Sequence, residues 1–481
     1  MKTENFNLIE ENWIPVLMKD GNNQLVSLGE LYEKSDEIAD LSLNPYERVA
    51  IMRLLICITM AALNENDLAD EMSWRNALSK IKPSVAQYLS KWHNKFNLFG
   101  PNAFMQPDDL SVKKESDKSE IVKLFPHFSS GNNGTLYDHG TVISYENIPI
   151  GMLVYLNYSA GGQHSKCFWG GVETSSSVSA GPAREKSMLQ IYAGGDSLLK
   201  TIWLNIITDE MIKTLPQPIK GRPIWELPNL SRSSVENSGA ENSVLGRLVP
   251  LSRVMKFTKG VTMFPLGEGI KYAPLPIARE CMAAVRLKED HGEQVMTYVS
   301  ASSNEMPWRN LHAILSMKDK CGSLTLRHVL NMQNDSFSIW CGGLEANKAK
   351  DVAAVEWSFA DDTSILGADE LSVYENGILL AKRVSQEKLY IAAKEYSTAM
   401  CLDGVNAILQ PMQFKYWDLL EKSQSILLQV AGKEINANEW RLVVNKTAKA
   451  ALDFACPHQS GRQLEAYVRA LKKLSMSLHN N

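Results

Sequence analysis

The first part of the chain alternates short apolar runs with turn signals. Two apolar runs flank the sequence DGNN at residues 20–23, and this pattern predicts two short strands joined by a turn. Asn44 and Pro45 then precede an apolar series that continues to Met60. An N-cap residue followed by a first-turn proline predicts that a helix begins there. Residues 148–158 are apolar almost throughout, which leaves a buried helix and a buried strand equally open.

The middle of the chain changes character twice. Residues 231–243 are rich in Ser, Asn and Gly, a composition that is typical of a linker. Residues 246–300 alternate short β-rich pieces with glycine and proline turns. This second pattern predicts a sheet region that contains a hairpin.

The last part of the chain is predicted to be helical. Four helical segments can be drawn, near residues 369–400, 412–430, 438–457 and 461–478. In the last of them, an apolar stripe with helical spacing is predicted to face the other helices. Its members are Leu464, Val468, Leu471 and Leu478. A four-helix bundle is the economical architecture for such a set.

The length of the chain supports a division into domains. At 481 residues, it exceeds the size at which one hydrophobic core usually stops growing. The predicted fold class is therefore α+β, with a large mixed N-terminal domain over residues 1–366 and a C-terminal four-helix bundle over residues 367–481.

The formal net charge of −4 argues against a protein that coats nucleic acid over its whole surface, because that mode needs a broadly basic surface. The predicted bundle nevertheless carries more Lys and Arg than Asp and Glu. Its basic residues near the C-terminus are Arg441, Lys446, Lys449, Arg462, Arg469, Lys472 and Lys473. A phosphate-facing patch and an ordinary solvated helix face both fit this composition.

Cysteine usage and the N-terminus suggest where the protein resides. The seven cysteines are scattered without a C-x-x-C pair, which favours reduced thiols over a disulfide framework or a zinc ribbon. The N-terminal residues contain no apolar signal region. The longest apolar run, residues 50–63, contains Arg53 and is too short to span a bilayer. We therefore expect a cytoplasmic protein that does not contact a membrane.

The usual catalytic motifs are missing from the sequence. It has no H-E-x-x-H, no Walker A loop, no G-x-S-x-G elbow and no G-x-G-x-x-G after a strand. Asp138 and His139 are adjacent, but neighbours on an extended segment point apart, so a catalytic dyad would need a third group. His127, His164 and Cys167 have no recognised zinc spacing. We expect no catalytic residues, no metal and no cofactor.

Two loops are shaped by small polar residues. The stretch SSGNNGTLYDH, residues 129–139, is rich in Gly and Asn, so we expect a shaped loop whose backbone amides and side-chain carboxamides face outward. Such a loop suits a partner that is rich in hydrogen-bond acceptors. The stretch SAGGQHS, residues 159–165, contains Gly161 and Gly162. This glycine pair is explained either by a tight turn or by close approach of the backbone to a ligand.

Several stretches in a consistent order resemble one family. They are FNLIEENWIPV at the start, NLFGPNAFMQ near residues 97–106, SGNNGTLYDH, GGDSLLKTIWLNII, and CGGLEANKAK at residues 341–350 ahead of the helical C-terminus. Together they are similar to the CasA family, the large subunit of the type I-E Cascade surveillance complex of prokaryotic CRISPR immunity. The resemblance covers essentially the full chain.

The resemblance implies two kinds of nucleic-acid contact. The loop with SGNNGTLYDH would dock the subunit near the guide RNA and a neighbouring Cascade subunit, with Asn132 and Asn133 as polar contacts and Phe128 as a stacking partner. A short protospacer-adjacent motif (PAM) would be recognised in the minor groove of duplex DNA. That groove presents a degenerate acceptor pattern and so tolerates several related sequences.

Three elements would recognise and open the DNA, by this resemblance. A glycine loop maps onto residues 159–165, with Gly161 and Gly162 at the close approach. A lysine finger maps onto Lys271, or in second place onto Lys259, since an ammonium can contact minor-groove acceptors as a point charge.

A wedge maps onto Asn347, Lys348 and Ala349, where relatives often place a glutamine. A lysine there could insert at the first base pair and hold a displaced phosphate, but it loses hydrogen bonds to base edges that an amide makes. An altered PAM tolerance is expected. An ordinary exposed turn lysine is the alternative interpretation of Lys348.

The resulting hypothesis is a non-catalytic DNA-recognition subunit of an RNA-guided antiviral complex. Its expected partners are guide RNA, other Cascade subunits, double-stranded target DNA and the CRISPR helicase-nuclease, the last through the basic patch of the bundle. The guide RNA would supply sequence specificity by base pairing once the duplex is opened. Two alternatives remain: a metal-dependent nuclease or hydrolase, and a purely structural scaffold subunit.

Overall fold

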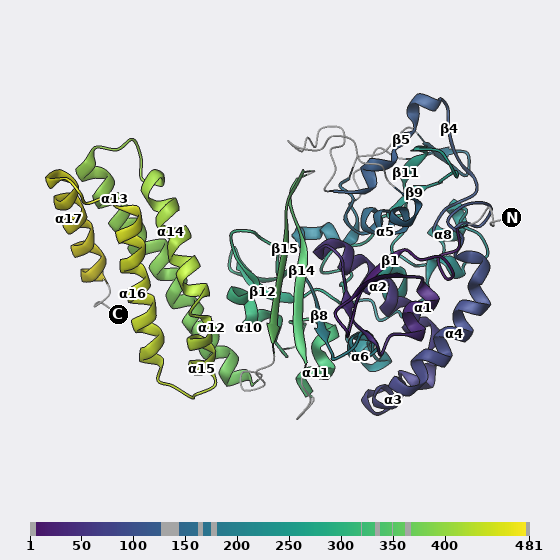
Figure 1. The fold of residues 1–481 in the computed structure, drawn as a ribbon, viewed down its shortest axis with the longest axis horizontal. Coiled ribbons are helices and arrows are strands. Elements are labelled where there is room, and N and C mark those ends of the chain that lie inside the picture. The colour runs from purple at the N-terminus through teal and green to yellow at the C-terminus, as the bar shows by residue number, and fades with distance from the viewer. Residues whose placement is uncertain are drawn as a thin grey trace. The chain divides into compact units, whose positions relative to one another are not determined.

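The chain folds into two compact units. The computed structural model describes residues 6–126, 144–161, 167–174, 180–318, 320–331, 337–348, 350–360 and 367–477. Unit 1 comprises Met1–Pro307 and Met317–Asp361, and unit 2 comprises Trp308–Ser316 and Asp362–Asn481. Figure 1 shows unit 1 as a mixture of helices and short strands, and unit 2 as a set of helices. The α+β prediction with a helical C-terminal region is confirmed.

The N-terminal elements follow from local sequence signals. Strands β1 (Ile14–Met18) and β2 (Asn23–Val26) pair antiparallel across the predicted turn, and β3 (Ile38–Leu41) adds to the other side of β1. Helix α2 (Pro45–Ala62) begins after the capping box of Asn44, as predicted. Most of α2 is buried because its apolar residues surround the helix.

Most of the remaining elements of unit 1 are short. Its other helices are α1 (Leu28–Glu33), α3 (Glu71–Ala77), α4 (Ile81–Trp92), α5 (Ile148–Tyr158), α6 (Leu198–Asn205), α7 (Asp209–Lys213), α8 (Arg232–Glu236), α9 (Val244–Leu248) and α11 (Arg327–Asn331). Its other strands are β4 (Leu110–Val112), β5 (Ser119–Glu120), β6 (Cys167–Trp169), β7 (Val172–Glu173), β8 (Gln190–Gly194), β9 (Arg253–Met255), β10 (Met263–Phe264), β11 (Leu266–Glu268), β12 (Val285–Asp290), β13 (Glu293–Tyr298), β14 (Ser338–Asn347) and β15 (Lys350–Ala360). Residues 148–158, which the pattern left open, form the buried helix α5.

Strands β14 and β15 form the long hairpin of unit 1 that Figure 1 shows side by side. Strand β8 pairs with β14 on the edge away from β15, which gives the order β15-β14-β8. The predicted hairpin in residues 246–300 is present as β9 with β11, and a second one follows as β12 with β13.

The predicted linker at residues 231–243 is wrong. Ser231 caps α8 by accepting a hydrogen bond from the Ser234 amide at 3.3 Å, and Ser243 caps α9 through the Gly246 amide at 3.3 Å. Serine is common in linkers, but the same hydroxyl is also a good N-cap for a helix. The short helices then bury Val235, Val244 and Leu245.

A buried ionic cluster links three segments inside unit 1. Arg53 of α2 donates to Glu280 Oε2 at 2.7 Å, and Arg247 of α9 donates to Glu280 Oε1 at 2.7 Å. Burial by itself would raise the pKa of Glu280, but Arg247 and Arg53 hold it below its usual range. Each charge is paired and hydrogen-bonded, which is the condition for burying it at tolerable cost.

Unit 2 is a four-helix arrangement with two of its helices interrupted. A π-helical turn, Val384–Lys388, joins α12 (Ala368–Arg383) to α13 (Leu389–Met400). A short break separates α14 (Asn406–Glu421) from α15 (Gln424–Ala431), and α16 (Ala437–Ala455) and α17 (Gly461–Ser477) follow. Unit 2 also contains α10 (Leu311–Ile314).

The predicted inward stripe of the last helix is wrong. Leu464 is 49% exposed and Val468 is 53% exposed, Leu471 is half-buried, and Leu478 lies outside the described residues. The buried positions are instead Ala466, Ala470 and Leu474, and the short alanine side chains let α17 pack closely on α13. Both sets have helical spacing, so the period alone did not distinguish the inner face from its neighbour.

No helix in the described part of the chain combines the length and apolar character needed to cross a membrane.

Candidate nucleic-acid site

A short segment that follows β7 in the chain is hydrogen-bonded to the C-terminal end of α5. We call residues 181–187 the bridging segment; it begins with a helical turn at Pro182 and is kinked at Glu185 and Lys186, whose backbone angles are not helical. The Gly181 amide donates to the Ser159 carbonyl at 2.9 Å, and Arg184 Nη1 donates to the Tyr158 carbonyl at 2.9 Å. A Cβ at Gly181 would lie 2.3 Å from the Asn157 carbonyl oxygen, so only glycine fits there.

These contacts locate the predicted glycine loop at the C-terminal end of α5. Gly161 is half-buried, and Gly162 lies outside the described residues. The buried Arg253 of β9 donates to the Ala160 carbonyl at 2.8 Å, which holds the backbone just before Gly161. The described start of the loop is therefore held from two sides.

The bridging segment also holds the tip of the β14–β15 hairpin. Arg184 Nη2 donates to the Lys348 carbonyl at 3.2 Å, and Arg184 Nη1 lies 2.5 Å from Asp351 Oδ1. Ser187 Oγ accepts from the Ala346 amide at 3.0 Å and lies 3.3 Å from its carbonyl. Arg184 is only 7% exposed, so one buried guanidinium joins the end of α5 to the predicted wedge.

The bridging segment also contacts a third element, the loop that contains Lys271. The Leu275 amide donates to Glu185 Oε1 at 3.2 Å, and Arg247 Nη1 donates to the Ala273 carbonyl at 3.0 Å. Burial raises the pKa of the Glu185 carboxyl to about 7. The Tyr272 hydroxyl accepts from the Leu251 amide at 2.8 Å. Lys271 itself is exposed, whereas the residues that follow it, Tyr272 and Ala273, are held by these hydrogen bonds.

The hairpin tip presents lysines to solvent. Asn347 pairs with Lys350 across a two-residue turn, and Lys348 takes a left-handed φ of 57° in that turn. Asn347, Lys348 and Lys350 are exposed, whereas Ala349 lies outside the described residues. Asp351, the nearest acidic side chain in sequence, is occupied by Arg184 and is only 20% exposed. The positive charge of the tip is therefore not cancelled by its own aspartate.

Lys259, the second-choice finger residue, lies at the other end of the β9–β11 hairpin. Residues 251 and 252 pair with 270 and 269 at the end near Lys271, whereas Lys259 follows at the opposite end. The pairing runs from residue 251 with 270 to residue 256 with 265, and five steps of about 3.3 Å separate its two ends by roughly 16 Å. Contacts through the bridging segment thus associate Lys271, rather than Lys259, with the predicted glycine loop and the predicted wedge.

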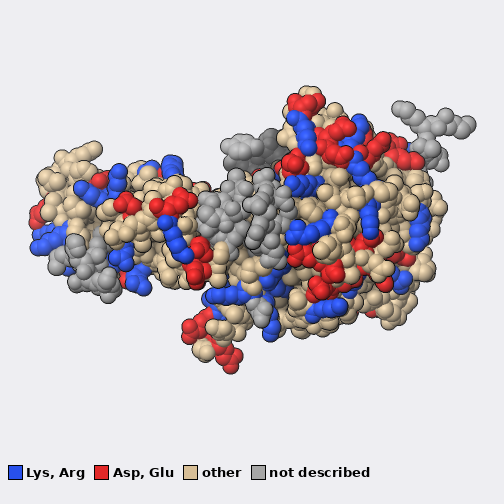
Figure 2. All heavy atoms as spheres, turned by 90° about the horizontal axis from the view of Figure 1, so that it is seen from below, with Lys and Arg blue, Asp and Glu red and all other residues tan. Residues whose placement is uncertain are grey.

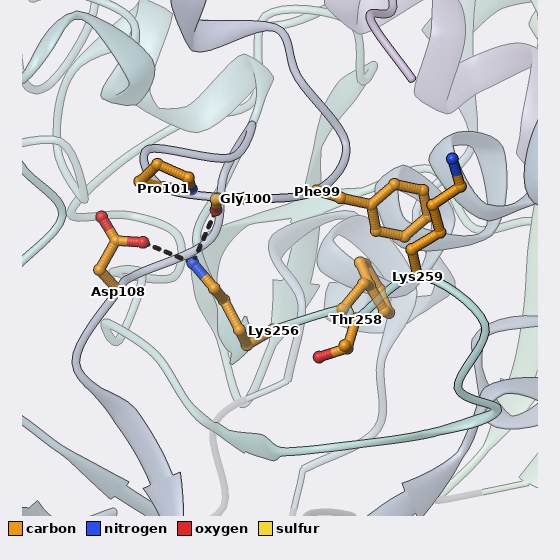
Figure 3. A pocket seen from close by; sticks show the side chains of 8 residues that line it. Phe99, Gly100, Pro101, Asp108, Lys256, Thr258 and Lys259 are labelled. Carbon is orange, nitrogen blue, oxygen red and sulfur yellow. Dashed lines mark hydrogen bonds and ion pairs between the residues drawn. The ribbon is translucent and has the colours of Figure 1, made fainter. Parts of the chain in front are cut away.

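Lys259 lines an open pocket of about 1000 Å³, which Figure 3 shows from close by. Lys256 Nζ donates across its floor to the Gly100 carbonyl at 3.1 Å and lies 2.5 Å from Asp108 Oδ1. Phe99, another lining residue, meets the ring of Tyr145 edge-on at 5.5 Å. Tyr145 follows residues 127–143, so this pocket adjoins the chain at one end of the predicted docking loop.

The seven basic residues predicted in the bundle lie on α16 and α17, and all are exposed. Arg462 Nη2 donates to Cys401 Sγ at 3.2 Å, and Arg469 pairs with Glu465 at 2.5 Å. On the face of unit 2 that Figure 2 shows, acidic side chains are interspersed with basic ones. That face is therefore mixed in sign.

Several predicted residues lie outside the described part of the chain. They are Phe128, Asn132 and Asn133 of the docking loop, together with His127, Asp138, His139 and His164. Cys167 is described, and it is buried with its pKa raised to about 12 by burial. Among the described residues, no group of three or more His, Cys, Asp or Glu side chains could hold a metal.

Sequence reasoning missed the bridging segment. It contains no recognised motif, and its residues GPAREKS differ little from an ordinary loop. Each contact joins positions far apart in the chain, from Tyr158 through Arg184 to Asp351. No local period or composition signals a pairing of that kind.

Comparison with known proteins gives consistent results. Residues 7–453 match the family model described as CRISPR-associated protein Cse1. A CasA/Cse1 protein of Thermus thermophilus is 29% identical over 350 residues, which span 69% of this chain and 64% of that relative. Less than two thirds of the relative is therefore covered.

Solved structures are similar over nearly the whole chain. The Thermus thermophilus CasA (Cse1) structure has a TM-score of 0.79 at 22% identity, with 100% of both chains covered. Cse1 of Thermobifida fusca has a TM-score of 0.77 at 17% identity, with 98% of both chains covered. A chain of a CRISPR RNA-guided surveillance complex has a TM-score of 0.76 at 17% identity, with 98% of this chain and 100% of that one covered. At these identities the structural matches establish the fold.

Proposed function

The chain belongs to the Cse1 family, and we propose that it is the DNA-recognition subunit of an RNA-guided CRISPR surveillance complex. In this proposal it binds duplex DNA, tests a PAM in the minor groove and starts strand separation, without breaking a bond. One observation supports this most: the bridging segment contacts the start of the glycine loop at Ser159, the loop of Lys271 and the β14–β15 hairpin. Three elements that the family resemblance assigns to one task therefore share one anchor.

The proposed mechanism begins with the minor groove. The backbone at Gly161 and Gly162 approaches the base edges, since residues without a Cβ allow the closest contact. Lys271 extends from an anchored loop toward the groove acceptors, and its ammonium group contacts them as a point charge. The A·T and T·A pairs present similar minor-groove acceptors, so this mode accepts several related motifs.

The hairpin tip then separates the first base pairs. The two-residue turn at Lys348 is narrow, and Arg184 fixes its backbone against the body of unit 1. A rigid tip can enter a base step because the energy of insertion is not lost in bending the hairpin. The ammonium of Lys348 holds a displaced phosphate, and Asn347 and Ala349 flank the point of entry. Guide RNA then pairs with one strand and supplies sequence specificity.

The other partners follow from the rest of the chain. We assign Phe128, Asn132 and Asn133 to contacts with guide RNA and a neighbouring subunit. The basic patch of α16 and α17 would contact a DNA strand and help to present the complex to the helicase-nuclease. We further propose that units 1 and 2 act as separate domains in these two tasks.

The proposal is tested with Lys271→Ala and Lys348→Ala in a reconstituted complex. Binding and strand opening are measured on guide-matched duplexes with randomised bases at the PAM position. We expect Lys271→Ala to weaken discrimination among PAMs, and Lys348→Ala to slow strand opening. Wild-type behaviour of both variants would favour a structural scaffold. Cleavage of labelled DNA by the purified chain with divalent metals would instead favour a nuclease.

A further inference from the structure

The bridging segment places a lysine beside the hairpin tip that neither the sequence motifs nor the family comparison assigns. Lys186 lies between Arg184, whose guanidinium contacts the Lys348 carbonyl, and Ser187, whose hydroxyl contacts the backbone of Ala346. Its flanking residues are therefore fastened to the hairpin on both sides of Asn347. The backbone of Lys186 is consequently held next to the tip, and its side chain is exposed.

The conformation of Lys186 is unusual for its residue type. The Met188 amide donates to the Glu185 carbonyl at 3.0 Å and closes a turn with Lys186 and Ser187 at its centre. Their φ angles are 52° and 50°, both in the left-handed region. Turns of this kind are usually built from Asn and Gly, because a Cβ is unfavourable at such angles. A lysine kept in a strained position suggests a task for its side chain.

The charges around Lys186 favour an anionic ligand. In the part of the chain that the structure describes, Lys186, Lys348 and Lys350 make no ion pair. The carboxylate of Asp351 is taken up by Arg184 at 2.5 Å. The carboxyl of Glu185 has its pKa raised to about 7 by burial, and it accepts from the Leu275 amide. The carboxylate of Asp351 therefore compensates little of the lysine charge, whereas Glu185 and Lys186 interact electrostatically without forming an ion pair.

We propose that Lys186 is a DNA-binding residue that contacts a backbone phosphate of the duplex as the β14–β15 tip engages it. This inference rests on the proposed function and adds a contact that carries no sequence information. Duplex DNA carries one charge per about 1.7 Å of its axis, so lysines on neighbouring segments can contact nearby phosphates together. Lys186 grips and orients the intact duplex, while Lys271 contacts the groove acceptors and Lys348 acts where the strands separate.

The test uses Lys186→Asn in the reconstituted complex. Asparagine accepts the left-handed φ and removes the charge, so the turn is kept and the phosphate contact is lost. Binding to duplexes with different PAM bases is measured between about 50 and 200 mM salt, the range over which phosphate contacts dominate affinity changes. We expect affinity to fall about 3- to 10-fold for every duplex, with the slope of log K against log[salt] shallower by about 1.

Three comparisons make this result specific. The thermal midpoint of Lys186→Asn should equal or exceed that of the wild type, because strain is relieved. Lys186→Arg should bind like the wild type. Lys19→Ala, which removes an exposed lysine after β1, is the matched control and should leave affinity and slope unchanged.

An unchanged affinity and salt slope in Lys186→Asn would overturn the inference, and so would a loss of affinity that arginine does not rescue. If Lys271→Ala still alters PAM discrimination in that case, the proposed function stands and only the role of Lys186 fails. If none of the lysine variants alters DNA binding, the proposed function fails as well.

Discussion

Replacing Arg184 by methionine should loosen the candidate site more than any surface change. The substitution keeps an unbranched apolar side chain like the aliphatic part of arginine but removes the donors to the Tyr158 and Lys348 carbonyls and the ion pair with Asp351. Breaking a buried ion pair by deleting one partner typically costs about 3–5 kcal/mol. Because Asp351 is 20% exposed and can recover some hydration, we expect about 2–3 kcal/mol here.

Urea denaturation of the full chain measures this loss, and a double-mutant cycle with Asp351→Asn isolates the pair. We expect the double variant to be more stable than the sum of the single effects by about 1 kcal/mol or more, since the two side chains touch. In the reconstituted complex, strand opening should slow more than initial DNA binding weakens. A loss of stability below about 0.5 kcal/mol, the range of neutral surface changes, would refute the assignment of Arg184 as the anchor.

Three further predictions concern other parts of the chain. The folded-state pKa of Glu185, about 7, lies above its ordinary 4.5, so its stabilising contribution is present below pH 4.5 and is lost as pH rises through 7. Glu185→Gln should remove about 1–2 kcal/mol of this pH dependence, measured by denaturation at pH 5 and pH 8, and an unchanged slope would contradict it. Glu280→Ala should cost about 3–5 kcal/mol in the same assay because it leaves Arg53 and Arg247 buried without a counter-charge, and a near-neutral result would contradict the cluster. Leu464→Ser should change the free energy of unfolding by less than about 0.5 kcal/mol, whereas a larger loss would show that α17 buries this position.

Local signals predicted many of the secondary elements. The turn between β1 and β2, the start of α2 at Pro45 and the helices of the C-terminal part depend on residues that are adjacent or one turn apart. Errors arose where one local signal fits two outcomes. Serines at 231 and 243 cap helices although their surroundings resemble a linker, and Leu464 has the spacing of a core residue on an exposed face.

The sequence by itself determined the composition of the candidate site, namely a glycine pair, a lysine near a turn and a hairpin with a lysine at its tip. Only the tertiary structure decided that Gly161, Lys271 and Lys348 belong to elements with a shared anchor, and that Lys259 lies at the far end of its hairpin. The physical reason is that local propensities act over a few residues of chain. The contacts of Arg184 join carbonyls and a carboxylate that are brought together only when the hydrophobic core has formed.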